Sequence, residues 1–255
     1  MKKINLIYVL ILFLTLVSKD FAQTNQNLTF PIPKLNVDIG TSQSGQDVAV
    51  TLQILLLMTI LALAPSIIIM TTSYLRIIIV FHFLKSALGT QQMPPGQLLS
   101  GIALFITFFV MAPTWNEVNE KALKPLMDKN ISVEEAYDKG IEPIRNFMFK
   151  HVRNEDLELF ISMANMERPN SRNDLPTYIV VPAFALSELR TGFIIGFFLF
   201  IPFLMVDLII SSILMSMGMM MLPPMLVSLP FKILLFILVD GWNLIVGSIV
   251  RSIVQ

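Results

Sequence analysis

Three charged side chains interrupt the apolar C-terminal third of the chain: Asp207, Lys232 and Asp240. An ionised group inside a membrane helix costs at least about 2.5 to 3.5 kcal/mol on insertion scales, so such groups normally face protein or water. Asp207 precedes Met219 by 12 residues, and Lys232 follows Met220 by 12 residues. The two are therefore equidistant from a turn at these methionines, and they form a buried ion pair if the flanking helices close on each other.

Asp240 is a poorer partner for Lys232. It lies eight residues further along the chain, which is about 80° round a helix at about 100° per residue. The alternative for these charges is an ion-coupling or proton-relay site, because intramembrane carboxylates mark ion pathways in transporters. A relay needs a series of titratable groups, which these helices do not offer, so the pattern favours a structural pair with Asp240 as a separate charge.

The expected turn is unusually rich in methionine. Six of the 16 methionines fall within residues 215–225. Three of them are consecutive and stand just before a proline pair: Met219, Met220, Met221, Pro223 and Pro224. Methionine is flexible and polarizable, so filling gaps in a core is one interpretation. The other is a gate loop, because loops of this kind from several subunits would form an apolar constriction that excludes water and opens for a polypeptide.

Residue types needed for covalent or metal chemistry are scarce. The chain has no cysteine and only two histidines, His82 and His151, which lie far apart in the sequence. This excludes thiolate nucleophiles and Cys-based metal sites and argues against a His-rich one. There is also no HExxH or GxSxG motif. We therefore expect no catalytic residues, no metal and no cofactor.

The composition is that of a membrane protein. Hydrophobic residues make up 55% of the 255 residues and charged residues only 14%, which is too apolar for an ordinary soluble domain. Lys plus Arg and Asp plus Glu both total 18, so no net charge points to a nucleic-acid partner. We expect an all-α integral membrane protein.

The N-terminus resembles a secretory signal peptide over residues 1–22. Lys2 and Lys3 precede an uncharged apolar run, residues 4–17, which is too short to span a bilayer comfortably. Asp20 departs from the small residue usually found near the cleavage site, so an uncleaved anchor is the alternative. Residues 23–47, rich in Pro, Asn, Gln and Gly, are then an extracytoplasmic arm without a core of its own.

Two long apolar helical hairpins are expected, each turning at a Pro-Pro loop. The first, residues 48–115, starts with a helix over 48–74 kinked at Pro65 and turns at Pro94 and Pro95. Helical hydrophobicity continues over residues 77–88, where it is interrupted by three basic residues: Arg76, His82 and Lys85. These are expected in a short loop region, which favours the cytoplasmic side.

A soluble helical insert, residues 116–182, follows the first hairpin. Its mixed charge and helical spacing predict an aqueous subdomain, and the parity of spans makes it periplasmic. The second hairpin, residues 183–255, is expected to pair helices over 191–217 and 226–250, joined by the methionine-rich gate loop.

Three long segments carry a more specific signal. They are LGTQQMPPGQLLSGIALFITFFVMAP at residues 88–113, PAFALSELRTGFIIGFFLFIPFLMVDLIISSILMSMGMMMLPP at 182–224 and SLPFKILLFILVDGWNLIVGS at 228–248. Together they resemble the FliP/SctR family of type III export-gate proteins, over roughly residues 48–252. The signal peptide is closer to the flagellar members of this family than to the injectisome relatives, which usually lack one.

The resemblance implies a pore-forming subunit that passes unfolded flagellar substrates across the bacterial inner membrane within the basal body. It implies a pentamer with FliQ and FliR, further partners FlhA and FlhB, and hairpins held largely in the periplasmic plane by neighbouring subunits. Met219 to Met221 would line the pore, and Asp207 with Lys232 would occupy the family's charged pair. The alternatives are the equivalent gate of a virulence-type secretion system and an ion-coupled transporter.

Overall fold

The computed structural model describes residues 45–90, 93–167, 171–219 and 221–254. The chain divides into two compact units, residues 1–53 and 54–255, and only the start of one helix is described in the first. The predicted signal peptide and most of the predicted arm lie outside the described residues. Within the described ranges every regular element is helical, which confirms the expected fold class.

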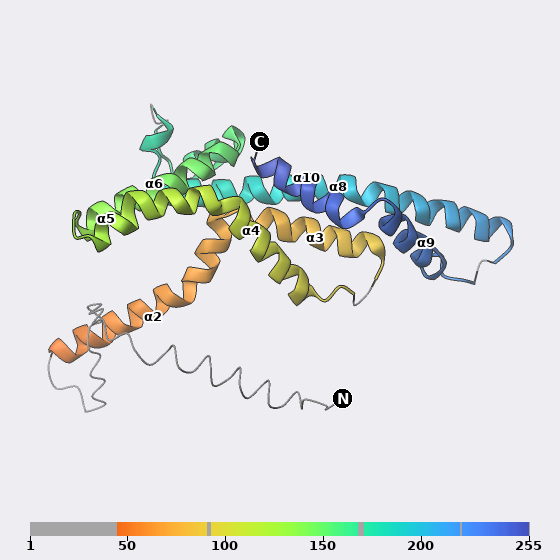
Figure 1. Cartoon of the computed structure of the whole chain (residues 1–255), viewed down its shortest axis with the longest axis horizontal. Coiled ribbons are helices and arrows are strands. Elements are labelled where there is room, and N and C mark those ends of the chain that lie inside the picture. The colour runs from red at the N-terminus through yellow and green to blue at the C-terminus, as the bar shows by residue number, and fades with distance from the viewer. Residues whose placement is uncertain (1–44, 91–92, 168–170, 220, 255) are drawn as a thin grey trace, which may run out of the picture. The chain divides into compact units, whose positions relative to one another are not determined.

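The helices are best followed in Figure 1. In chain order they are α2 (Gly45–Thr71), α3 (Tyr74–Leu88), α4 (Gly96–Val118), the π-helical turn η1 (Asn119–Leu123), α5 (Lys124–Met127), α6 (Val133–His151), α7 (Asn154–Met163), the short 3₁₀ turn η2 (Arg172–Asp174), α8 (Thr177–Ser216), α9 (Pro224–Leu238) and α10 (Gly241–Val254).

Among the described residues, three helices are long and apolar enough to cross a membrane: Val50–Thr71, Gly96–Met127 and Thr177–Ser216. Taken as one broken span, α9 and α10 make a fourth, bent by 64°. The chain is thus an all-α membrane protein with two hairpins. One turns between α3 and α4, the other between α8 and α9, and in each case a proline pair stands at the start of the returning helix.

The insert packs on the first turns of α8, a helix that begins earlier in the sequence than expected. The sequence analysis started this helix at residue 191, but α8 begins at Thr177 and continues through Pro182 and Pro202. Met148 of α6, Leu157 of α7, and Val180 and Phe184 of α8 share one buried apolar cluster. The expected boundary at residue 182 therefore lies inside a helix, and the insert uses the start of α8 as part of its core.

The return helix of the second hairpin is broken, contrary to the single helix expected over residues 226–250. Asp240 adopts a left-handed backbone, with φ 49°, and separates α9 from α10. The adjacent Gly241 lies so close to the Phe236 ring that a Cβ there would overlap it. At the break, a glycine thus packs beneath an aromatic ring, a contact that periodicity does not reveal.

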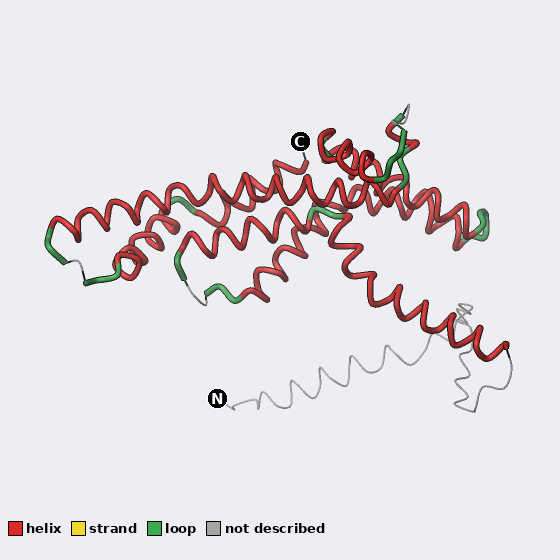
Figure 2. The backbone as a smooth tube through the Cα atoms, turned by 180° about the vertical axis from the view of Figure 1, so that it is seen from behind, coloured by secondary structure: helices red, strands yellow, loops and turns green. Residues whose placement is uncertain are grey.

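Helices α3 and α8 lie side by side, as Figures 1 and 2 both show. Two glycines one turn apart on α8 allow this approach. A Cβ at Gly192 would lie 3.1 Å from Ile79, and a Cβ at Gly196 would lie 2.5 Å from the Phe83 ring. Closely packed membrane helices often carry small residues at this four-residue spacing. The α3–α8 contact therefore fixes the framework on which the charged residues are placed.

This contact predicts that Gly196→Ala destabilises the protein. Overpacking costs about 1–3 kcal/mol, and it should outweigh the gain of up to about 1 kcal/mol in helix propensity. The midpoint of thermal unfolding in detergent measures the effect.

Gly101→Ala in α4 is the matched control, because nothing lies within 4 Å of the added Cβ. Adding Phe83→Ala to Gly196→Ala should recover part of the loss. Equal midpoints for the Gly196 and Gly101 variants would contradict the packing argument.

Candidate functional site

The structure brings Asp207 of α8 and Lys232 of α9 together. Lys232 Nζ lies 2.6 Å from Asp207 Oδ2, and the side chains are 3% and 28% exposed, respectively. Each charge has a second partner. Lys232 Nζ donates to the carbonyl oxygen of Ala87 in α3 at 3.0 Å, and Ser228 Oγ donates to Asp207 Oδ1 at 2.6 Å. We call Ala87, Asp207, Ser228 and Lys232 the Lys232 cluster.

Local helix geometry explains how this cluster forms. Ser228 and Lys232 are four residues apart on α9, so both point to the same side and meet one carboxylate. Ala87 lies in the last turn of α3, where carbonyl groups lack intrahelical partners and the helix dipole favours a cation. One lysine therefore compensates a carboxylate and a helix terminus, and it joins α3, α8 and α9.

A second buried charge cluster, which sequence reasoning missed, lies at the other end of α3. Arg76 makes two hydrogen bonds to the Glu188 carboxylate, and Arg76 Nε lies 2.8 Å from Glu188 Oε2. Arg76 Nη1 also donates to Ser252 of α10, at 2.6 Å to the carbonyl and 3.2 Å to the hydroxyl. Both charged side chains are fully buried. We call Arg76, Glu188 and Ser252 the Arg76 cluster.

This cluster corrects the expected position of three basic residues. Arg76, His82 and Lys85 lie within helix α3 and not in a loop. Arg76 tolerates burial because a bidentate carboxylate and a helix C-terminus satisfy it. The sequence could have indicated Glu188 as a buried charge, because it lies close to a long apolar run. Its partner was not detectable, because 112 residues separate the two.

The end of α10 is also held by the insert. His151 Nε2 lies 2.9 Å from the Ile253 carbonyl oxygen, and Lys150 Nζ lies 3.4 Å from that of Val254. Because Arg76 also donates to the Ser252 carbonyl oxygen, three basic side chains contact the last carbonyl groups of α10. A helix C-terminus favours such groups because its carbonyls are unpaired and its dipole is negative there.

Asp240 is an exposed residue at the break between α9 and α10. Its carboxylate has no hydrogen bond or ion pair with any described residue. It directly precedes α10, where the helix dipole favours a negative charge. The sequence analysis placed it inside a continuous apolar helix, and that position is wrong because the helix ends before it.

The methionine loop projects from the tip of the second hairpin. The Met219 side chain is 37% exposed and that of Met221 is 99% exposed, while Met220 lies outside the described residues. Pro223 caps α9, and Pro224 is its first residue, a position where proline's fixed φ suits a helix. Gly218, with φ 74°, ends the turn after α8. Met219 and Met221 therefore do not fill this chain's own core.

The described part of the chain holds no group of three or more His, Cys, Asp or Glu side chains that could bind a metal ion. Two charge clusters hold α3 to its neighbours, and a further polar contact joins the buried Asp156 of α7 to Ser187 of α8, whose hydroxyl donates to the carboxylate at 2.6 Å. Their geometry fixes helices rather than presenting a reactive atom to a cavity.

The Lys232 cluster predicts that Asp207→Ala destabilises the protein by about 3–5 kcal/mol, because it strands a buried ammonium group. Lys232→Ala should cost less, since Asp207 is partly exposed and keeps Ser228. The charge swap should recover part of the loss, because Ser228 can accept from a lysine while the Ala87 carbonyl loses its donor.

Thermal unfolding in detergent and the amount of protein in membranes measure these effects. Asp240→Asn is the control. We expect it to cost less than about 1 kcal/mol, because its carboxylate has no partner among the described residues and only the dipole of α10 favours its charge. Equal damage in the swap and in both single variants would count against the pair.

Comparisons with known proteins agree with the resemblance in the sequence. A model of the FliP family matches residues 57–249. Relatives described as flagellar biosynthetic protein FliP include one from Bacillus subtilis, 55% identical over 216 residues, which cover 85% of this chain and 98% of the relative. Another, from Borreliella burgdorferi, is 45% identical over 249 residues, covering 94% and 96%. A third, from Caulobacter vibrioides, is 47% identical over 218 residues, covering 86% and 81%. The predicted family is confirmed: this chain belongs to the FliP family, and it is a membrane protein of the flagellar export apparatus.

Proposed function

We propose that the chain is a pore-forming subunit of the flagellar type III export gate and passes unfolded substrates across the bacterial inner membrane. The observation that carries this proposal is the fully exposed Met221 in a methionine-rich loop at the tip of a charge-fixed hairpin. A flexible thioether surface adapts to many side chains. A ring of such loops closes to water by dewetting and parts for a polypeptide.

The apolar surface of the chain supports assembly with other subunits. None of the side chains in the most apolar window of α2 is buried, and only 11% of those in the α8 window are. Helix α8 has 40 residues, about 60 Å at about 1.5 Å per residue. This is twice the roughly 30 Å hydrocarbon thickness of a bilayer. We infer that neighbouring protein covers much of it, as in a pentamer with FliQ and FliR that also engages FlhA and FlhB.

The two charge clusters suit a gate with a fixed frame and a movable tip. They hold α3 at both ends against α8, α9 and α10. Beyond Asp207 and Lys232, the hairpin tip over residues 208–231 has no ion pair among its described residues. Opening can therefore be confined to the methionine loop while the frame keeps its packing. An ion-coupled transporter receives less support, because Asp207 is neutralised by a lysine and a serine.

The gate proposal predicts that replacing Met219, Met220 and Met221 by Ala leaves the complex assembled but leaky. Alanine is too short to close the constriction, so ion conductance should rise several-fold. Planar-bilayer conductance of the purified complex measures this. Met127→Ala with Met163→Ala is the control, because both methionines are exposed in the insert. Unchanged conductance in an assembled complex would argue against the loop as the constriction.

Deletion of the gene in its own bacterium should abolish swimming and the secretion of filament subunits, while an intact copy restores both. Motility in soft agar and filament protein in the culture medium measure the two effects. Normal swimming combined with lost secretion of virulence effectors would instead identify the chain as the gate subunit of a virulence-type secretion system.

A further inference from the structure

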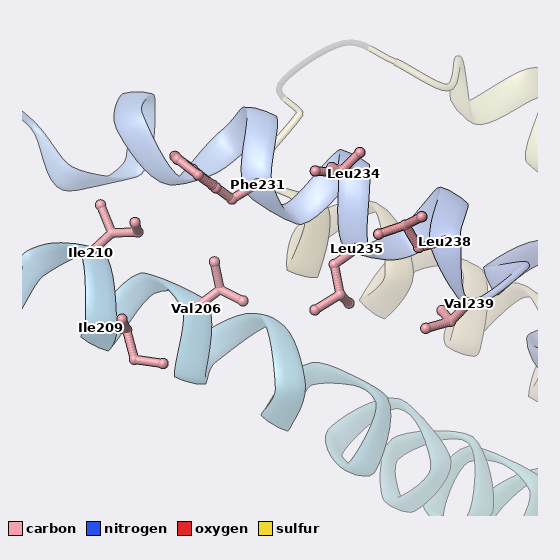
Figure 3. A pocket seen from close by; sticks show the side chains of 8 residues that line it. All are labelled: Val206, Ile209, Ile210, Phe231, Leu234, Leu235, Leu238 and Val239. Carbon is pink, nitrogen blue, oxygen red and sulfur yellow. The ribbon is translucent and has the colours of Figure 1, made fainter.

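Two cavities of the second unit differ in polarity. The one between α8 and α9, drawn in Figure 3, is lined by side chains such as Phe231 and Leu238, and all those that the figure labels are apolar. The other lies between α4, α6 and α10 and has a volume of about 340 Å³. It includes these polar side chains: Thr114, Glu117, Asn146, Lys150 and His151. Titratable groups therefore meet solvent in the second cavity.

His151, the last residue of α6, lies between two backbone carbonyl groups. Its Nδ1 is 2.8 Å from the Phe147 carbonyl oxygen in its own helix, and its Nε2 is 2.9 Å from the Ile253 carbonyl oxygen in α10. The ring also packs against the Phe147 ring, with 4.5 Å between the centroids. One side chain thus joins the insert to the end of α10.

Both contacts need a hydrogen on the ring nitrogen, because a carbonyl oxygen accepts hydrogen bonds and cannot donate them. A neutral imidazole carries one N–H, whereas the imidazolium carries two. Neutral His151 therefore makes only one of the two bonds, and its other nitrogen directs a lone pair at a carbonyl oxygen. Only the protonated ring satisfies the whole geometry.

Two features favour a positive charge on His151. The C-terminal carbonyl groups of α10 are the negative end of its dipole. Glu117 of α4 lines the same cavity, although it also pairs with Lys121 at 3.2 Å. The charged side chain of α10 itself, Arg251, lies back along its own helix, with Nη2 3.6 Å from the Cβ position of Gly247.

Two cations oppose that charge. Lys150 Nζ and Arg76 Nη1 contact the neighbouring carbonyl oxygens of α10, at 3.4 Å and 2.6 Å. Arg76 is compensated by Glu188 of α8, and the Lys150 contact is long and exposed. In α7, Asp156 accepts from Ser187. The Ile253 carbonyl oxygen is contacted by His151, so the imidazolium takes a place that the other cations leave.

We propose that His151 makes the contact between the insert and α10 dependent on pH. Histidine is the side chain whose charge changes between about pH 5 and 8. With the ring protonated, both bonds hold the end of α10 on α6. As the pH rises and the ring loses its proton, one bond is lost and that end loosens. The methionine loop takes no part, so the proposal is independent of the export gate.

The absence of native cysteine allows a direct test in the full-length chain in detergent. Ile253→Cys places a thiol at a position that is 2% exposed, and Val254→Cys places one at a position that is 62% exposed. Maleimide labelling of each is followed by mass spectrometry at about pH 5.5 and about pH 8, on either side of the range in which histidine ionises. The ratio of the two labelling rates cancels the pH dependence of thiol chemistry.

We expect labelling of the Ile253→Cys chain, relative to the Val254→Cys chain, to rise about tenfold between the two pH values, as one hydrogen bond to a charged group is lost. His151→Gln should remove this rise. His82→Gln is the matched control, because His82 is the other histidine of the chain and lies exposed on α3. A constant ratio in the chain with both histidines would overturn the proposal. A rise that survives His151→Gln, or that disappears with His82→Gln, would do the same.

A second measurement needs no substitution at His151. Nitrogen-15 NMR of the chain labelled at its histidines distinguishes an N–H from a bare ring nitrogen, and the His82→Gln spectrum assigns the two rings. At about pH 5.5 His151 should carry hydrogens on both nitrogens, and at about pH 8 on one. A neutral ring at the lower pH contradicts the proposal, as does a ring that stays doubly protonated at the higher pH.

Discussion

A charge removed from water must find a partner, and this requirement organises the second unit of the chain. Its three most deeply buried described charges, Arg76, Glu188 and Lys232, lie at the two ends of α3 and bridge to neighbouring helices. Removing a single partner leaves an uncompensated charge, which is far more costly than the pair itself. The clusters therefore fix the relative level of helices whose apolar surfaces alone would allow sliding, and the glycine contacts between α3 and α8 set their distance.

The same arrangement divides the second hairpin into two parts. Toward the insert, α8 shares a core with α6 and α7, and α10 ends against three basic side chains. Toward the tip, many large apolar side chains remain exposed. A chain with this distribution has a packed core near the insert but leaves much of its apolar surface uncovered. This is expected of one subunit in a membrane assembly of the export apparatus.

The sequence predicted those features that depend on local pattern. The equal spacing of Asp207 and Lys232 from the turn reflects helix geometry, and the proline pairs mark where returning helices start. Other features depend on contacts between distant residues. The partner of Arg76 is such a case. The break at Asp240, where Gly241 packs against the Phe236 ring, was not predicted either, because helical periodicity does not report side-chain contacts. The early start of α8 was missed because its first turns carry a charge, Glu188, and the sequence does not reveal that this charge is buried against Arg76.

The exposure of Met221 has a chemical consequence of its own. A thioether open to solvent is accessible to peroxides, and its oxidation to the sulfoxide adds a polar oxygen to an otherwise apolar surface. Water wets such a surface more readily, and reductases reverse the change. The thioether chemistry on which the proposed gate relies thus also makes this loop a point where oxidation acts directly on the protein.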